Sequence, residues 1–129
     1  YIYTAHINEY GELENDYVDQ EVRDSDYNKL QINGTYYFVV EYYRGTVGGS
    51  QVVEYDRKSE WKLNLKDIDG LTDAEIKHLD GLMIMDVIDN NIISIHPKKA
   101  STLIGHTFTL TVTDITGESR STIDVEVIG

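Results

Sequence analysis

The chain has 129 residues, a length that fits one domain, or one domain with an extra segment. Its 23 acidic and 11 basic residues give a formal net charge of −12, so it repels nucleic acids and anionic membranes and neither is an expected partner. It contains no Cys, which excludes a disulfide framework, a thiol nucleophile and a Cys-based zinc site.

The first thirty residues combine a short strand with a strongly acidic segment. Residues 1–7 (YIYTAHI) have the composition of a strand. Residues 9–26 contain eight acidic residues and one basic residue, Arg23. This composition fits an exposed edge strand, a solvated loop or a linker, and the sequence does not decide between them. We expect residues 1–30 to be an acidic segment that a preceding domain could supply, and residues 31–129 to form the main domain.

The strongest predicted strand covers residues 35–44 (TYYFVVEYYR), after a turn at Asn33-Gly34. Alternation along a strand gives two faces: Tyr36, Phe38, Val40 and Tyr42 on one, and Tyr37, Val39, Glu41 and Tyr43 on the other. Both faces are rich in apolar surface, so we expect this strand to be covered twice. Either it is a central strand of a sandwich, or a neighbouring domain or subunit covers it. In the second case Tyr37 and Tyr43 are the predicted partner-binding residues.

The next segment is predicted as a loop followed by two strands. Residues 45–50 (GTVGGS) have the composition of a flexible loop, and strands are expected at 51–56 and 59–65. The second strand carries its large apolar residues on one face: Trp61, Leu63 and Leu65. A single Trp on an inner strand is typical of the core of Ig-like sandwiches, so Trp61 is expected to be buried between two sheets.

One short helix is predicted. Thr72 and Glu75 match the capping box, in which the Thr side chain caps the third helical amide and the Glu side chain reaches back to the amide of the capping Thr. The helix is expected at about residues 73–80, with strands at 83–88 and 92–95.

The end of the chain is the clearest β pattern. In residues 107–113 the apolar positions alternate with Thr, and in residues 122–127 they alternate with polar residues. A short polar loop, 114–118, joins the two runs, which predicts a β-hairpin with one buried and one solvated face.

The segment after the Trp61 strand has part of a calcium-loop pattern. Asp67-Ile68-Asp69-Gly70 begins like an EF-hand loop, but the fifth, sixth and twelfth positions are Leu71, Thr72 and His78. These are not the oxygen ligand, Gly and Glu that such a loop needs. A turn leading into the capped helix is the better interpretation, and no metal site is predicted.

Catalytic motifs are absent from the sequence. The four His residues show no ligand spacing, and no GxSxG, SxxK or Walker motif occurs. Carboxylates are so abundant that finding two of them does not indicate a glycosidase. We therefore expect a protein that is not an enzyme and needs no cofactor.

From Trp61 onward the chain resembles a bacterial Ig-like (Big-type) module, of the kind found in phage virion proteins and bacterial surface proteins. The resemblance is carried by these residues: Trp61-Lys62-Leu63, Asp89-Asn90-Asn91, residues 104–114, Gly117 and residues 122–128. It covers about half of the chain, and two departures are evident. The predicted helix interrupts a plain strand connection, and the acidic first thirty residues have no counterpart. The family has no common functional site, so no site residue is carried over.

The expected fold is all-β, an Ig-like β-sandwich with one short helix. The resemblance implies a structural or interaction module of a bacteriophage virion protein in the neck, tail or head, which packs on partner subunits or displays loops to the host. The alternative is a cell-surface or secreted adhesin that binds host glycans through Tyr rings. Either function places the protein in a virion or outside the cell, as part of a larger oligomeric assembly. No membrane span is present, and since the chain begins at Tyr1 we expect a piece of a longer protein.

Overall fold

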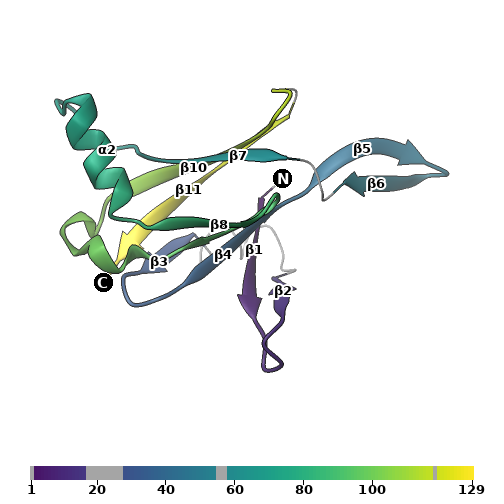
Figure 1. Cartoon of the computed structure of the whole chain (residues 1–129), viewed down its shortest axis with the longest axis horizontal. Coiled ribbons are helices and arrows are strands. Elements are labelled where there is room, and N and C mark those ends of the chain that lie inside the picture. Colours follow the sequence, from purple (N-terminus) through teal and green to yellow (C-terminus); the bar gives the residue numbers. More distant parts are fainter. Residues whose placement is uncertain (1, 17–27, 55–57, 118) are drawn as a thin grey trace.

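The computed structural model describes residues 2–16, 28–54, 58–117 and 119–129. Within these ranges the chain is mostly β, with two main sheets packed face to face and a single α-helix at one end (Figure 1). The prediction of an all-β sandwich with one short helix is confirmed. No helix of the described part is long and apolar enough to cross a membrane.

The first sheet has five strands in the order β2-β1-β4-β9-β8, with antiparallel pairing throughout. Its strands are β1 (Ile2–Ile7), β2 (Leu13–Asn15), β4 (Tyr36–Val40), β8 (Met85–Asp89) and β9 (Ile92–Ile95).

The second sheet has four strands in the order β3-β11-β10-β7. Its strands are β3 (Lys29–Gln31), β7 (Ser59–Leu65), β10 (Thr107–Asp114) and β11 (Arg120–Ile128). The predicted C-terminal hairpin is confirmed, since β10 and β11 pair from Thr107 with Glu126 to Thr113 with Arg120. On β10 the inward residues Phe108, Leu110 and Val112 are fully buried, as alternation requires when one face packs on the core.

The core lies between the two main sheets. Fully buried side chains from the first sheet, such as Phe38 and Ile93, meet those of the second, such as Phe108 and Val125. Trp61 and Leu63 of β7 are also buried in this cluster and Leu65 packs against it, so the predicted apolar face of that strand is confirmed.

The helix α2 (Asp73–Gly81) matches the predicted segment closely. The Thr72 hydroxyl accepts a hydrogen bond from the Glu75 amide, and the Glu75 carboxylate accepts one from the Thr72 amide, so the capping box is complete. The Asp80 carboxylate in turn accepts a hydrogen bond of 2.8 Å from the Leu65 amide. This bond ties the helix to the end of β7. Two short 3-10 turns, Pro97–Lys99 and Ser101–Leu103, follow β9.

The long strand predicted at residues 35–44 is wrong as a single element. It divides at Glu41 into β4 and a separate strand, β5 (Tyr42–Val47). Opposite Val40 the neighbouring strand β1 begins at Ile2, and β9 ends its pairing at Val39. Within the described residues the pairing of β4 in the first sheet ends at Val40, and the chain continues as β5 in a separate sheet.

The loop predicted at residues 45–50 is also wrong. β5 continues to Val47 and pairs with β6 (Ser50–Glu54), so that only Gly48 and Gly49 form the turn. Both glycines have positive φ, 61° and 83°, which is the conformation that a tight two-residue hairpin turn needs. The strand predicted at 51–56 corresponds to β6, and residues 55–57 lie outside the described residues.

Part of the predicted acidic segment 1–30 belongs to the sandwich. β1 lies between β2 and β4 in the first sheet, and Ile2 and Leu30 are both buried in the core. β3 pairs with β11 in parallel, a long-range contact that no local pattern indicated. The most acidic stretch, residues 17–27, lies outside the described residues, so its predicted exposure and the domain boundary after residue 30 stay predictions.

We expect Gly34→Ala to destabilise the protein. A Cβ added at Gly34 would lie 2.6 Å from Cε2 of Tyr36 and 2.7 Å from its hydroxyl, and this hydroxyl accepts a hydrogen bond from the Gln31 amide. The ring must move and lose that bond, so urea unfolding should show a loss of about 1–3 kcal/mol. In a Tyr36→Ala background the same substitution should cost almost nothing, and an undiminished cost there would contradict the proposed clash.

Candidate functional site

The two residues predicted to bind a partner lie on different sheets. Tyr37 is on β4, paired with Ala5 of β1 and Ser94 of β9, and is half-buried. Tyr43 is on β5, paired with Val53 of β6. Because the strand divides at Glu41, these tyrosines do not share one continuous strand face as the sequence had suggested, and their partner-binding role stays a prediction.

The hairpin of β5 and β6 forms a two-stranded sheet of its own (Tyr42–Val47 and Ser50–Glu54). It projects from one end of the sandwich, opposite the end that carries α2 (Figure 1). At its base Tyr42 is buried, and its hydroxyl lies 2.6 Å from the Ser59 hydroxyl of β7. We call this hairpin, residues 42–54, the arm.

A hollow of about 270 Å³ lies where β1 separates from β4, beside β3. Eight residues line it: Thr4, Ala5, His6, Asp16, Lys29, Thr35, Tyr36 and Tyr37. They come from four separate segments of the chain. Of these residues the sequence had singled out only the tyrosines, because nothing in the local pattern indicates that β3 lies beside β1 and β4.

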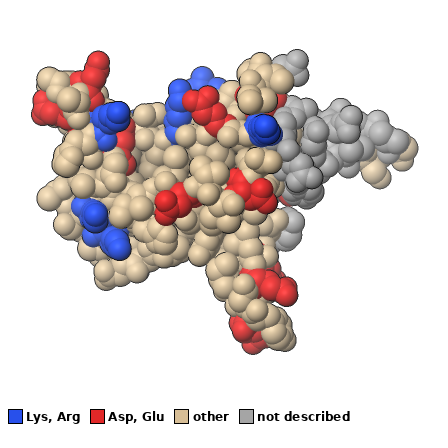
Figure 2. All heavy atoms as spheres, viewed as in Figure 1, with Lys and Arg blue, Asp and Glu red and all other residues tan. Residues whose placement is uncertain are grey.

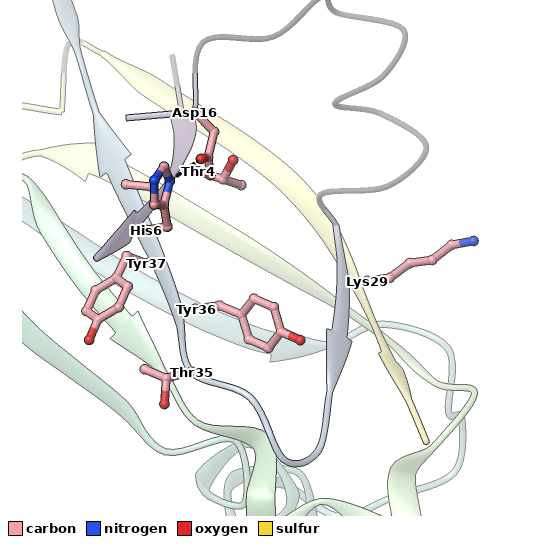
Figure 3. Close-up of a pocket in the computed structure, with 8 residues that line it drawn as sticks. Thr4, His6, Asp16, Lys29, Thr35, Tyr36 and Tyr37 are labelled. Carbon is pink, nitrogen blue, oxygen red and sulfur yellow. Dashed lines mark hydrogen bonds and ion pairs between the residues drawn. The ribbon is translucent and has the colours of Figure 1, made fainter. Parts of the chain in front are cut away.

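The polar side chains in the lining of the hollow are partly preorganised by hydrogen bonds. Nδ1 of His6 lies 2.5 Å from an Asp16 carboxylate oxygen, and its Nε2 lies 3.5 Å from the Glu14 carboxylate. The Thr35 hydroxyl lies 2.9 Å from Nδ1 of His96. Figure 3 shows His6 and Asp16 facing each other on one side of the hollow, with Tyr36 directed toward the strand that carries Lys29. The imidazole thus connects the two strands of the first hairpin.

The segment with a partial calcium pattern has a structural role. Both carboxylate oxygens of Asp67 lie 3.3 Å from the Thr107 amide, and one lies 3.2 Å from Nδ1 of His106. Desolvation raises the pKa of Asp67, but the Thr107 amide and the hydrogen bond and charge of His106 outweigh it, so this pKa lies below its ordinary value. Asp67 therefore fixes the start of β10. Within the ranges that the structure describes, no group of three or more His, Cys, Asp or Glu residues is placed to hold a metal ion.

Calcium is expected to have no specific effect on stability. The Asp67 carboxylate already accepts hydrogen bonds from the chain, and the calcium-loop pattern lacks two of its ligands and the Gly of its turn. Millimolar calcium should therefore raise the melting temperature no more than magnesium or sodium at equal ionic strength, since all of them only screen the net charge. A shift unique to calcium in differential scanning fluorimetry would contradict this prediction.

The ion pair of Lys66 with Asp124, on the solvated face of the C-terminal hairpin, contributes to the stability of the fold in a pH-dependent way. The hydrogen bond from Nζ of Lys66, 2.6 Å from the Asp124 carboxylate, lowers the pKa of Asp124 below its ordinary value of 3.8, and the Thr109 hydroxyl adds to this effect. Because the pKa of Asp124 is lowered in the folded state, its contribution to the free energy of unfolding is fully present above pH 3.8. This contribution is lost as the pH falls through the lowered pKa of the folded protein.

We expect Asp124→Asn to cost about 0.5 kcal/mol of stability near pH 6, because this pair is solvent-exposed. The cost should shrink as the pH is lowered below the ordinary pKa of Asp and vanish once the wild-type carboxyl is protonated. Chemical denaturation of both proteins across this pH range measures the difference, and a difference that grows toward low pH would contradict the assignment.

The described surface carries its acidic residues on several projecting elements rather than in one site. Figure 2 shows acidic side chains on α2 and on the hairpin of β1 and β2. On this hairpin Glu9, Glu12 and Glu14 are exposed, together with the large apolar ring of Tyr10. Such a surface disfavours contact with a second copy of the same face.

Comparison of the chain with protein-family models, curated proteins and solved structures found no match. The resemblance to bacterial Ig-like modules thus stays an expectation from the sequence. Candidate functions follow from the arm, the hollow and the charge of the chain.

Proposed function

We propose that the chain is a non-enzymatic interaction module of a bacteriophage virion protein, from the neck, tail or head, that packs on partner subunits or displays its loops to the host surface. The observation that carries this proposal is the arm, residues 42–54, which extends from the sandwich as a sheet of two strands (Figure 1). The resemblance of the sequence from Trp61 onward to modules of such proteins supports the same assignment.

The arm is suited to binding a partner for an energetic reason. A lone two-stranded hairpin is at best marginally stable in water. Among the described residues the two strands of the arm pair only with each other, so the arm gains stability when a partner covers it. Its base is held on the sandwich by the buried Tyr42 and its contact with Ser59. The direction of the arm is therefore set before binding, which lowers the ordering cost of association.

The partner is expected to be a different subunit rather than a second copy of this chain. With a net charge of −12, two copies repel each other unless a specific interface overcomes the repulsion. Isolated protein should consequently be monomeric in size-exclusion chromatography with light scattering.

The test is to replace residues 43–53 by a short Gly-Asn turn and to co-express the variant with the other proteins of its particle. The melting temperature of the sandwich should change little, whereas incorporation of the variant into particles should be lost. The matched control shortens the other projecting hairpin at residues 8–12, which lie between β1 and β2, and should leave incorporation intact. Normal incorporation of the armless variant would refute the proposal.

A second candidate function is a cell-surface or secreted adhesin that binds host glycans, and the hollow beside Tyr36 and Tyr37 favours it. A tyrosine ring with polar groups around it suits a sugar, since the ring packs on the sugar while hydroxyls form hydrogen bonds. Either function places the protein in a virion or outside the cell. A glycan array separates them, because a module that binds only protein subunits gives no signal there.

A further inference from the structure

One edge of the first sheet carries exposed apolar side chains. The strand β8 lies last in the strand order and, among the described residues, pairs only with β9. Its Val87 is 64% exposed, and the next residue, Ile88, is 54% exposed. In the part of the chain that the structure describes, the other edge strands of the two main sheets (β2, β3 and β7) have no exposed large apolar side chain. An open edge of this kind provides N–H and C=O groups with which another chain can pair.

The backbone of β8 is oriented to accept an additional strand. The His96 amide donates a hydrogen bond of 3.0 Å to the Ile84 carbonyl, just before β8 begins. In an antiparallel ladder, residues that bond to the neighbouring strand alternate with residues whose N–H and C=O point the other way. The backbone groups of Asp86 therefore point toward β9, and those of Met85 and Val87 point to the open side.

The side chains of β8 determine which sequence an added strand needs. Met85 packs against the core cluster, and by alternation Val87 lies on the same face of the strand, whereas Asp86 lies on the opposite face. An added strand would place apolar residues beside Met85 and Val87, and the residue between them beside the exposed Asp86. The other charged residue of β8, Asp89, is acidic and exposed as well. The matching segment therefore alternates apolar residues with Lys or Arg.

A second copy of this chain does not match the edge. Antiparallel pairing of two β8 strands would bring the acidic residues of both copies close together, and each copy carries a net charge of −12. Like charges opposite each other destabilise a strand pair. The occupant is therefore a different polypeptide, with positive charge over the segment that pairs.

The open edge lies next to the base of the arm. The turn after β8 includes Asn91, whose carbonyl accepts a hydrogen bond of 2.9 Å from the Val40 amide at the end of β4. The arm begins two residues later, at Tyr42. Figure 1 shows the turn between β8 and β9 beside the point where the chain passes from β4 into β5. One partner can therefore contact the arm and the edge of β8 together.

We propose that the open edge of β8 binds, as an additional strand of the first sheet, an extended segment of the partner subunit in which apolar residues alternate with Lys or Arg. Strand addition of this kind obtains affinity from main-chain hydrogen bonds and specificity from alternate side chains. The inference rests on the proposed function in one respect, since it takes the subunit that contacts the arm as the partner. The edge is a separate site, so it can be tested without the particle.

The test uses the isolated protein, and NMR amide shifts report binding of an acetylated heptapeptide that alternates Lys with Val. This peptide should shift the amides of Met85 and Val87 most strongly, with a Kd in the millimolar range or below. Two control peptides should bind at least about tenfold more weakly: one with Glu in place of Lys, and one N-methylated at each Val, which cannot donate the main-chain hydrogen bonds. The proposal is overturned if the Lys peptide does not bind, if the N-methylated peptide binds equally well, or if the strongest shifts lie elsewhere.

Asp86→Lys separates recognition by the edge from attraction by the net charge. This variant should bind the Lys peptide about tenfold more weakly and the Glu peptide about tenfold more tightly. Glu9→Lys, at an exposed position between β1 and β2, changes the net charge equally and should keep the preference of the wild type. An equal response of the two variants would show that the peptide follows the net charge alone, and the site would be refuted.

Val87→Pro removes the outward amide of the edge and keeps the bonds to β9. Since Pro is tolerated on an edge strand where its missing N–H would face solvent, the melting temperature should stay close to that of the wild type. Binding of the Lys peptide should weaken at least about tenfold, whereas Val87→Thr, which keeps the amide and the branched shape, should bind normally. If the wild type is a dimer in size-exclusion chromatography and Val87→Pro a monomer, the occupant is a second copy and the proposal is wrong. The armless variant leaves β8 unchanged, so its incorporation into particles tests the proposed function separately.

Discussion

Trp61→Ala should lower the free energy of unfolding by about 3–5 kcal/mol, because it leaves a cavity between the two sheets. Trp61 is 7% exposed, belongs to the central core cluster and lies opposite Val112 on the neighbouring strand β10. The sheets are held by the strands around it and cannot collapse fully into the space. Urea unfolding followed by circular dichroism measures the loss.

Trp61→Phe is the control for this prediction. The indole N–H of Trp61 has no hydrogen-bond partner within the described part of the chain, so the smaller ring removes an unpaired donor while it fills most of the space. Its cost should therefore stay below about 1.5 kcal/mol. As the chain has one Trp, its fluorescence reports this position alone and should be blue-shifted in the folded protein. Emission typical of a water-exposed indole would show that Trp61 does not lie in the core.

Tyr43→Ser should weaken the association of the module with its partner by about 30-fold, the effect of removing one hot-spot tyrosine worth about 2 kcal/mol. Tyr43 lies on β5 of the arm, in a two-stranded sheet separate from the two main sheets. We therefore expect the melting temperature to stay close to that of the wild type. Incorporation into particles at limiting concentration of the variant measures the effect.

Two other tyrosines serve as controls for Tyr43→Ser. Tyr10, on the hairpin between β1 and β2, is 79% exposed, and Tyr10→Ser should affect neither stability nor assembly. Tyr37 is half-buried on β4, so Tyr37→Ser should cost about 1–2 kcal/mol of stability through lost apolar burial and leave the arm intact. If Tyr43→Ser assembles as well as Tyr10→Ser does, the arm tyrosine is not part of an interface.

The local elements of this fold could be predicted because their signals lie within a few residues of one another. Strict alternation in residues 107–113 and 122–127 forms a buried face only in a strand, which is why the hairpin of β10 and β11 was predictable. The Thr72–Glu75 pair closes a capping box within one turn, so the start of α2 was predictable as well. The paired glycines at 48 and 49 carried an equally local turn signal, which the prediction of a flexible loop missed.

The candidate site could not be predicted in the same way. The hollow joins Thr4 and His6 of β1 to Tyr36 of β4 and Lys29 of β3, and these strands are brought together by the packing of two sheets. Amino-acid composition and residue spacing carry no information about how these strands are brought together.

The sequence by itself determined that this chain is an acidic all-β protein with a Trp-containing core, a C-terminal hairpin and one capped helix. These features were predictable because alternation and helix capping depend on residues that are close together in the chain. The tertiary structure decided where the strand after Thr35 divides, since a strand continues in a sheet only while its neighbours pair with it, and among the described residues the pairing with β1 and β9 ends at Val40. It also decided that β3 pairs with β11. That pairing joins Lys29–Gln31 to Glu126–Ile128 at the far end of the chain, and it is favourable only once the core between the sheets has formed.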